Sequence, residues 1–132
     1  MVNNLFEYKE LEKIAGKGRI LPAFPGAGGS ITDDILDASL TPRFIQPTTF
    51  GEITGVKTKR SKYLAQIFKK SKIPYQEIKD MHKWQLCHLA MVIPIADAYY
   101  EAVCPKEVGL EKDIMQRTAK RLKRNFIFLK KD

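Results

Sequence analysis

The chain has 132 residues, of which 44% are hydrophobic and 29% charged, a composition that suits one compact globular core and excludes a disordered or repetitive chain. Its 23 basic and 15 acidic side chains give a formal net charge of +8, which is compatible with a nucleotide, a nucleic acid or an anionic membrane as partner. No signal peptide opens the sequence, and its most apolar run, Trp84 to Tyr100, is shorter than the roughly 20 residues that span a bilayer.

The chain opens with a predicted helix from Leu5 to Ala15. Its apolar side chains recur at helical spacing, Asn4 can cap its start and Gly16 can end it. The residues before it, 1–4, are typical of the end of a buried strand. We therefore expect the chain to begin in the middle of a fold.

Strands are expected next. Arg19 to Phe24 suits a buried strand, and the glycine-rich run from Pro25 to Gly29 predicts a tight loop after it. Ile31 to Leu40 and Arg43 to Phe50 are expected to pair with each other, with Pro42 and Pro47 confining the second strand to an edge or a bulge.

The glycines of this loop, Gly26, Gly28 and Gly29, also invite a comparison with phosphate-binding loops, because glycine lets backbone amides approach an anion. No helical pattern follows at once, and no acidic residue ends a strand about 20 residues later. A plain tight turn is therefore favoured over a cofactor cradle.

From Thr58 the apolar period becomes helical, and the helix should end before Pro74. After an extended piece from Pro74 to Ile78, a long helix is expected from Met81 to Val103. This helix is apolar almost all round, so we expect other elements to wrap it as the core helix.

The last segment predicts an amphipathic helix. Its stripe consists of Leu110, Ile114, Thr118, Leu122, Phe126 and Leu129. Its other faces are basic, with no acid among Arg117, Lys120, Arg121, Lys123, Arg124, Lys130 and Lys131. Such a run could neutralise phosphates along a groove, although it is usually a solvated helix face. The stripe calls for an apolar partner, so we expect a homo-oligomer.

Four polar or sulfur-bearing residues are candidates for chemistry. His88 follows Trp84 by four residues on the long helix, where it is either a core histidine or a neutral imidazole that serves a substrate hydroxyl or carbonyl. Asp97 is expected to be structural. Cys87 and Cys104 lack metal-ligand spacing and indicate buried thiols in a reducing compartment, hence a cytoplasmic location and no metal site.

Three blocks of sequence carry a family resemblance. They are Arg19-Ile-Leu-Pro-Ala-Phe-Pro-Gly-Ala-Gly-Gly, Gln46-Pro-Thr-Thr-Phe-Gly-Glu-Ile-Thr-Gly and Met81-His-Lys-Trp-Gln-Leu-Cys-His-Leu-Ala. In their order and spacing the chain resembles the ketopantoate reductase (2-dehydropantoate 2-reductase) family over roughly residues 1 to 105.

The resemblance implies a fragment of an α/β protein. Residues 1–57 would be the C-terminal strands of an incomplete Rossmann-type NADPH-binding domain, and residues 58–132 an incomplete all-α substrate and dimerisation domain. The full-length parent would reduce a 2-oxo acid with NADPH, whereas the isolated chain is expected to be inactive and to bind no cofactor tightly.

The resemblance also implies site residues. Asn3 or Asn4 stands where the family has a cofactor-binding asparagine. Trp84 occupies the position of the family's catalytic lysine, Lys83 is one place out of register, and His88 is the polar residue left as a candidate acid. Two alternative functions stay open: a small basic nucleic-acid-binding protein, which is disfavoured because no aromatic and basic surface motif accompanies the charge, and a non-catalytic dimerising module.

Overall fold

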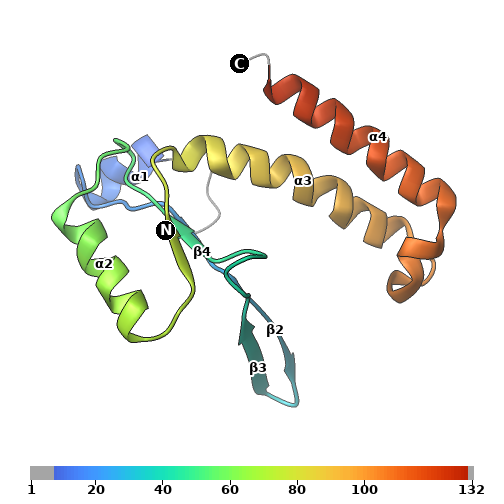
Figure 1. Ribbon diagram of the computed structural model, residues 1–132, viewed down its shortest axis with the longest axis horizontal. Coiled ribbons are helices and arrows are strands. Elements are labelled where there is room, and N and C mark those ends of the chain that lie inside the picture. The colour runs from blue at the N-terminus through green and yellow to red at the C-terminus, as the bar shows by residue number, and fades with distance from the viewer. Residues whose placement is uncertain (1–7, 131–132) are drawn as a thin grey trace. The chain divides into compact units, whose positions relative to one another are not determined.

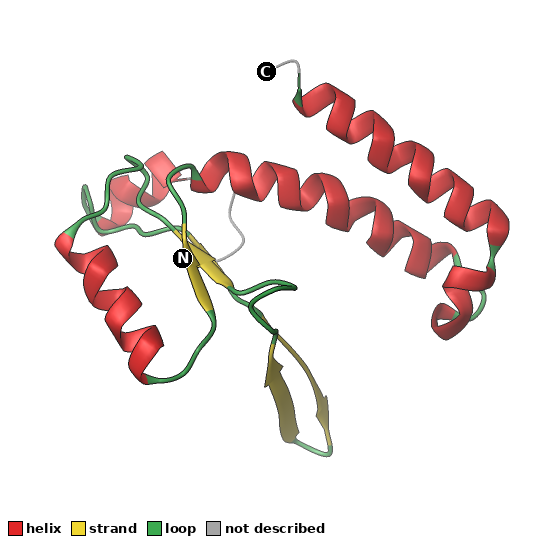
Figure 2. Cartoon of the chain, in the orientation of Figure 1, coloured by secondary structure: helices red, strands yellow, loops and turns green. Residues whose placement is uncertain are grey.

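The computed structural model describes residues 8–130. Its elements in chain order are α1 (Tyr8–Ala15), β1 (Ala23–Phe24), β2 (Ala27–Thr32), β3 (Ile35–Leu40), β4 (Thr48–Phe50), α2 (Lys59–Lys70), β5 (Tyr75–Glu77), α3 (Met81–Glu101), the 3-10 helix η1 (Pro105–Leu110) and α4 (Lys112–Leu129). These elements, drawn in Figures 1 and 2, form two compact units that meet in sequence at His82 and Lys83. The mixed α/β class is confirmed, while a Rossmann-type sheet stays a prediction.

The first unit is built on a three-stranded sheet with the order β1-β4-β5. β1 runs antiparallel to β4, and β4 runs parallel to β5. The parallel pair requires a crossover, which α2 supplies. Phe50 is fully buried, and its ring lies 5.6 Å from that of Phe68 on α2 and 6.2 Å from that of Tyr75 on β5. This aromatic cluster joins the helix to the sheet.

The unit continues beyond residue 58, because α2 and β5 belong with the sheet. The expectation that only helices follow residue 58 is therefore wrong at β5, where the predicted extended piece is a strand. The division into two domains of a longer parent, at residues 57 and 58, stays a prediction.

The predicted pairing of Ile31–Leu40 with Arg43–Phe50 is wrong. β2 pairs with β3 in an antiparallel hairpin, from Ala27↔Leu40 to Thr32↔Ile35, and β4 pairs with β1 and β5 instead. The turn is Asp33-Asp34, with φ of 50° and 60°. Two successive positive φ values match the twist of a two-residue hairpin. The tight loop predicted from Pro25 to Gly29 is thus wrong from Ala27 onward, because these residues belong to β2.

Two glycines are explained by close backbone approach. A Cβ on Gly26 would lie 2.4 Å from the backbone nitrogen of Thr48, and a Cβ on Gly51 would lie 2.4 Å from the backbone oxygen of Ile78. Gly26 therefore lets the base of the hairpin meet the chain that enters β4. Gly51 lets the end of β4 lie against the segment that leads to α3.

Helix α2 begins where the periodicity predicts. Thr58 is its N-cap: the Ser61 amide donates to Thr58 Oγ1 at 3.2 Å, and the Thr58 amide donates to Ser61 Oγ at 3.1 Å. This reciprocal pair satisfies two backbone donors that the helix leaves open. The helix ends at Lys70, and Lys72 then adopts a φ of 56°, so the chain turns back toward β5.

The second unit is a helical hairpin. Glu101 near the end of α3 accepts from Arg117 at 2.9 Å and from Arg121 at 3.0 Å, and Asn125 donates to the Ala90 oxygen at 3.1 Å. Ala98 of α3 and Ile114 and Thr118 of α4 are buried. The predicted stripe therefore contributes Ile114 and Thr118 to the contact between the helices. Its first residue, Leu110, lies in η1 and is 81% exposed.

The prediction that α3 is a wrapped core helix is wrong for the described residues. Pro94 and Ala98 are buried, but Ile93, Tyr99 and Tyr100 are exposed. Within the second unit α4 runs alongside α3, and a single neighbouring helix covers only one face of α3.

Candidate functional site

A cavity of about 300 Å³ lies in the first unit, where the chain leaves β4 and where it enters α3. Its lining comes from four separate stretches: Tyr8, Pro22, Glu52, Ile53, Thr54, Gly55, Lys79, Asp80, Met81 and His82. Met81 and Pro22 are buried and form its apolar part. Lys79, Asp80 and His82 are exposed, so the polar groups lie toward solvent. A cavity of this size fits a small polar molecule.

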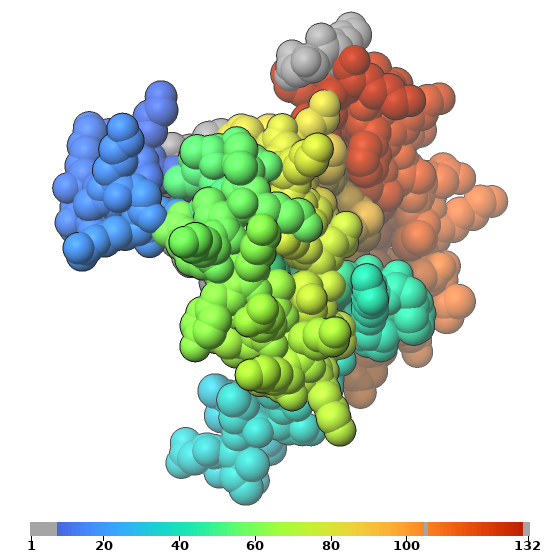
Figure 3. All heavy atoms as spheres, turned by 60° about the vertical axis from the view of Figure 1, so that its left-hand side comes forward, coloured from blue at the N-terminus to red at the C-terminus, as the bar shows by residue number. Residues whose placement is uncertain are grey.

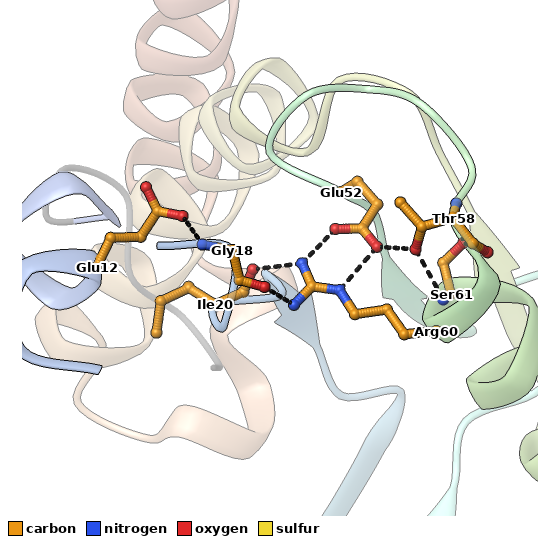
Figure 4. A network of polar contacts seen from close by, with 7 residues as sticks. All are labelled: Glu12, Gly18, Ile20, Glu52, Thr58, Arg60 and Ser61. Atoms are coloured by element: carbon orange, nitrogen blue, oxygen red, sulfur yellow. Dashed lines mark hydrogen bonds and ion pairs between the residues drawn. The ribbon is translucent and has the colours of Figure 1, made fainter. Parts of the chain in front are cut away.

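One wall of the cavity is held in place by the contact between Arg60 and Glu52 (Figure 4). Arg60 Nε donates to Glu52 Oε1 at 2.9 Å, and its Nη2 donates to Oε2. The same guanidinium donates to the backbone oxygens of Gly18 and Ile20. Arg60 thus ties the start of α2, the loop after β4 and the chain before β1 to one another, as a planar five-donor group can.

Glu52 is a fixed anion. It is 5% exposed, and besides the two Arg60 nitrogens it accepts from the Thr58 hydroxyl. The hydrogen bond from Arg60 lowers the pKa of Glu52 and outweighs the effect of burial, with Thr58 adding to the lowering. Because both carboxylate oxygens are engaged with protein donors, Glu52 is suited to shaping the cavity and poorly suited to taking a proton.

The sequence-predicted acid, His88, lies on α3 in the second unit and stacks on Trp84. The two ring centroids are 5.0 Å apart and the ring planes differ by 7°. Burial lowers the pKa of His88, so the neutral imidazole is favoured at pH 7. The other predicted site residues, Asn3 and Asn4, lie outside the described residues.

The basic run on α4 is partly used inside the second unit. Arg117 and Arg121 both bind Glu101, and Arg121 also lies 3.4 Å from Asp97. The Arg117 and Arg121 hydrogen bonds lower the pKa of Glu101. The structural role expected for Asp97 stays a prediction. Arg117 and Arg121, two of the cations that could bind phosphates, therefore hold α3 and α4 together.

The thiols differ from their prediction. Cys87 is half-buried, but Cys104 is exposed, because it lies beyond the end of α3 at the start of η1. Within residues 8–130, no group of three or more His, Cys, Asp or Glu side chains gathers closely enough to hold a metal ion.

The described residues do not fit the pyrophosphate of a dinucleotide. Such a group needs free backbone amides on a glycine turn that leads into a helix. Here Ala27 to Thr32 form a strand paired with β3, and a second strand follows the turn in place of a helix. The run from Gly26 to Gly29 therefore does not form such a turn.

A second cavity in the first unit, of about 620 Å³, lies beside β5 and was not predicted from the sequence. It is lined by Arg43, Lys57, Ala65, Lys69, Lys72, Ile73, Pro74, Tyr75, Gln76 and Glu77. Lys57 binds Glu77 at 3.0 Å. Burial raises the pKa of Glu77, but the Ser61 hydrogen bond and Lys57 outweigh it, so the pKa is lowered. The basic residues that line this second cavity are scattered along the sequence, so no local sequence pattern predicts the cavity.

None of the described helices is both long enough and apolar enough to span a membrane. A scan against family models finds no match to this chain, and comparison with curated proteins and with solved structures finds none either.

Proposed function

We propose that this chain is part of an NADPH-dependent oxidoreductase of the ketopantoate reductase type, whose full-length parent reduces a 2-oxo acid. The observation that carries the proposal is the way three separated blocks of sequence meet. Pro22 comes from the first block, Glu52 to Gly55 from the second, and Met81 and His82 from the third, and all of them line the 300 Å³ cavity.

The cavity offers chemistry that suits a small keto acid. Lys79 brings a cation to the lining and Asp80 and His82 bring further polar groups, while Pro22 and Met81 supply an apolar wall. A 2-oxo acid has a carboxylate for the cation and a short carbon chain for the wall. The contact of Arg60 with the buried Glu52 carboxylate fixes the part of the lining that follows β4, and a positioning site requires such fixed geometry.

His88, which lies in the second unit and is not among the residues that line the cavity, is the proposed proton donor on the family resemblance alone. In that role its protonated imidazole would give a proton to the alkoxide oxygen that forms when the keto group is reduced, and the ring would end neutral. Because burial lowers the pKa of His88, the protonated form is the minor one at neutral pH. Reduction should therefore become faster as the pH is lowered toward that pKa.

The cofactor belongs to the parent in this proposal. NADPH would supply the hydride, but Gly26 to Gly29 offer no cradle for its pyrophosphate. In the isolated chain, calorimetric titration with NADPH should show weak binding or none. Stoichiometric binding in the low-micromolar range would contradict the assignment of the cofactor to other residues.

The deciding experiment uses the longest protein that the reading frame encodes. NADPH oxidation should be followed spectroscopically with ketopantoate and with other 2-oxo acids. His88→Gln should lower kcat by about 10²- to 10⁴-fold, the usual contribution of a general acid, whereas His82→Gln, which changes a residue of the cavity lining, should act mainly on KM. Failure of every 2-oxo acid to promote NADPH oxidation would overturn the proposal.

A further inference from the structure

The β2–β3 hairpin has two chemically different faces. Directly opposed residues in an antiparallel pair share a face, and faces alternate along each strand. The register therefore places Ala27, Gly29, Ile31, Leu36, Ala38 and Leu40 on one face, and Gly28, Ser30, Thr32, Ile35, Asp37 and Ser39 on the other. The first set is apolar or small throughout.

This apolar face is open in the structure. All twelve residues of the two strands are exposed, and Ile31, Leu36 and Leu40 keep 73%, 67% and 48% of their surface. In the space-filling view the hairpin, coloured cyan, stands out beyond α2, coloured green (Figure 3). An isolated two-stranded hairpin is marginally stable in water, so it gains from a partner on this face.

The charge of the hairpin narrows the choice of partner. Residues 26–42 contain Asp33, Asp34 and Asp37 and no Lys or Arg, in a chain whose net charge is +8. Two of these aspartates form the tip. A surface that receives the hairpin must therefore combine positive charge with an apolar floor.

The second cavity of the same chain has that combination. Arg43, Lys69 and Lys72 provide cations, Ile73, Pro74 and Tyr75 provide apolar lining, and Glu77, the acidic residue of the lining, is already bound to Lys57. The cavity also borders β5, which ends the strand order of the described sheet and so leaves one edge for an incoming strand.

We propose that the hairpin of one copy docks into the basic cavity beside β5 of a second copy. The carboxylates of Asp33 and Asp34 meet Lys69 and Lys72, and Ile31 and Leu36 pack against Ile73 and Tyr75. A two-fold arrangement makes this contact twice and closes the assembly as a dimer. The surfaces involved are separate from the 300 Å³ cavity, so this proposal does not depend on the proposed reductase function.

Isotope-mixed cross-linking tests the contact directly. Chains grown with ¹⁴N and with ¹⁵N are mixed, treated with a carbodiimide that joins a carboxylate to a nearby amine, and analysed by mass spectrometry. The expected product is a mixed-isotope peptide pair that joins Asp33, Asp34 or Asp37 to Lys69 or Lys72. Mixed pairs confined to α4, or hairpin pairs within a single isotope, would overturn the proposal.

Matched variants test the energetics. Ile31 and Ile35 have similar exposure, 73% and 70%, but lie on opposite faces. Ile31→Thr should raise the dissociation constant about tenfold, since it removes apolar area from the interface, while Ile35→Thr should leave it nearly unchanged. Sedimentation equilibrium measures both, and circular dichroism checks that both remain folded.

The charges have their own matched pair. Lys69→Glu, inside the cavity, should weaken association, and Lys62→Glu, on α2 but outside the lining, should not. Asp33→Asn with Asp34→Asn removes the charges of the tip and keeps residues that tolerate positive φ. A monomer for the unmodified chain at about 100 μM, a concentration that saturates any micromolar interface, refutes the proposal, as do equal effects within either pair.

Discussion

Arg60 holds both carboxylate oxygens of Glu52 from the first turn of α2, although the two residues lie on opposite sides of the capping residue Thr58. Glu52 is 5% exposed, whereas the Arg60 side chain keeps 38% of its surface. The carboxylate therefore depends on Arg60 and Thr58 for its solvation, while the guanidinium can still reach water. Removing Arg60 should therefore lower the stability of the fold more than removing Glu52.

Glu52→Gln should lower the free energy of unfolding by about 1–3 kcal/mol, because charge-assisted hydrogen bonds are lost in a buried place. Glu10→Gln is the control, since Glu10 forms an ion pair with Lys13 in which the two side chains are 66% and 71% exposed. Exposed pairs of this kind are worth at most about 1 kcal/mol. Urea denaturation of both variants measures the difference, and equal losses would contradict a structural role for Glu52.

The same contact should make the chain acid-sensitive. Arg60 lowers the folded-state pKa of Glu52, so the unfolded state takes up a proton first as the pH falls. The stabilisation is fully present above the ordinary glutamate pKa of about 4.3 and is lost as the pH falls through the lower folded-state value. Glu52→Gln should flatten this acid limb of the stability curve, with Glu77 leaving a remainder because its pKa is lowered too.

His88 should impose a separate pH dependence at higher pH. Burial lowers its folded-state pKa, so below the ordinary value of about 6.5 the unfolded state binds a proton that the folded state does not. Stability should therefore decrease from that pH down to the folded-state pKa, and His88→Gln should remove the decrease. NMR titration of the imidazole in a His82→Gln background gives the pKa itself; a value above the ordinary range would contradict the prediction.

Two glycines form a further test of packing. Gly51→Ala places a methyl group 2.4 Å from the Ile78 oxygen, which backbone atoms cannot readily avoid, so it should destabilise the first unit by about 1–3 kcal/mol. Gly28→Ala enters open space in β2 and should be neutral or slightly stabilising, by up to about 1 kcal/mol. Thermal melts compare the two, and a tolerated Gly51→Ala would count against the close approach of β4 to the segment before α3.

Binding to nucleic acid should be weak and indifferent to sequence. Arg117 and Arg121 bind Glu101, so two of the seven cations of the basic run are engaged inside the second unit, and each phosphate contact made by the others contributes a log-log slope of about −0.9 on duplex DNA. Fluorescence anisotropy against salt measures the slope, and Lys120→Glu with Lys123→Glu should reduce it. Nanomolar affinity for one sequence at physiological salt would support nucleic-acid binding in place of the proposed function.

The sequence by itself determined the local elements. The helix from Thr58, the extended piece before residue 79 and the long helix from Met81 all form close to where periodicity and capping predict, because spacing and caps act within a few residues. The mixed α/β class follows from the same patterns.

The tertiary structure alone decided which strands pair and which residues meet. Gly26 to Gly29 resemble a loop until their neighbours are known, because glycine's role there depends on backbone atoms of residues 37 and 46–48. Short-range rules likewise do not predict the contact between Arg60 and Glu52, the lining of the two cavities, or the pairing of Arg117 with Glu101. Such contacts are set by long-range packing, which local propensity does not encode.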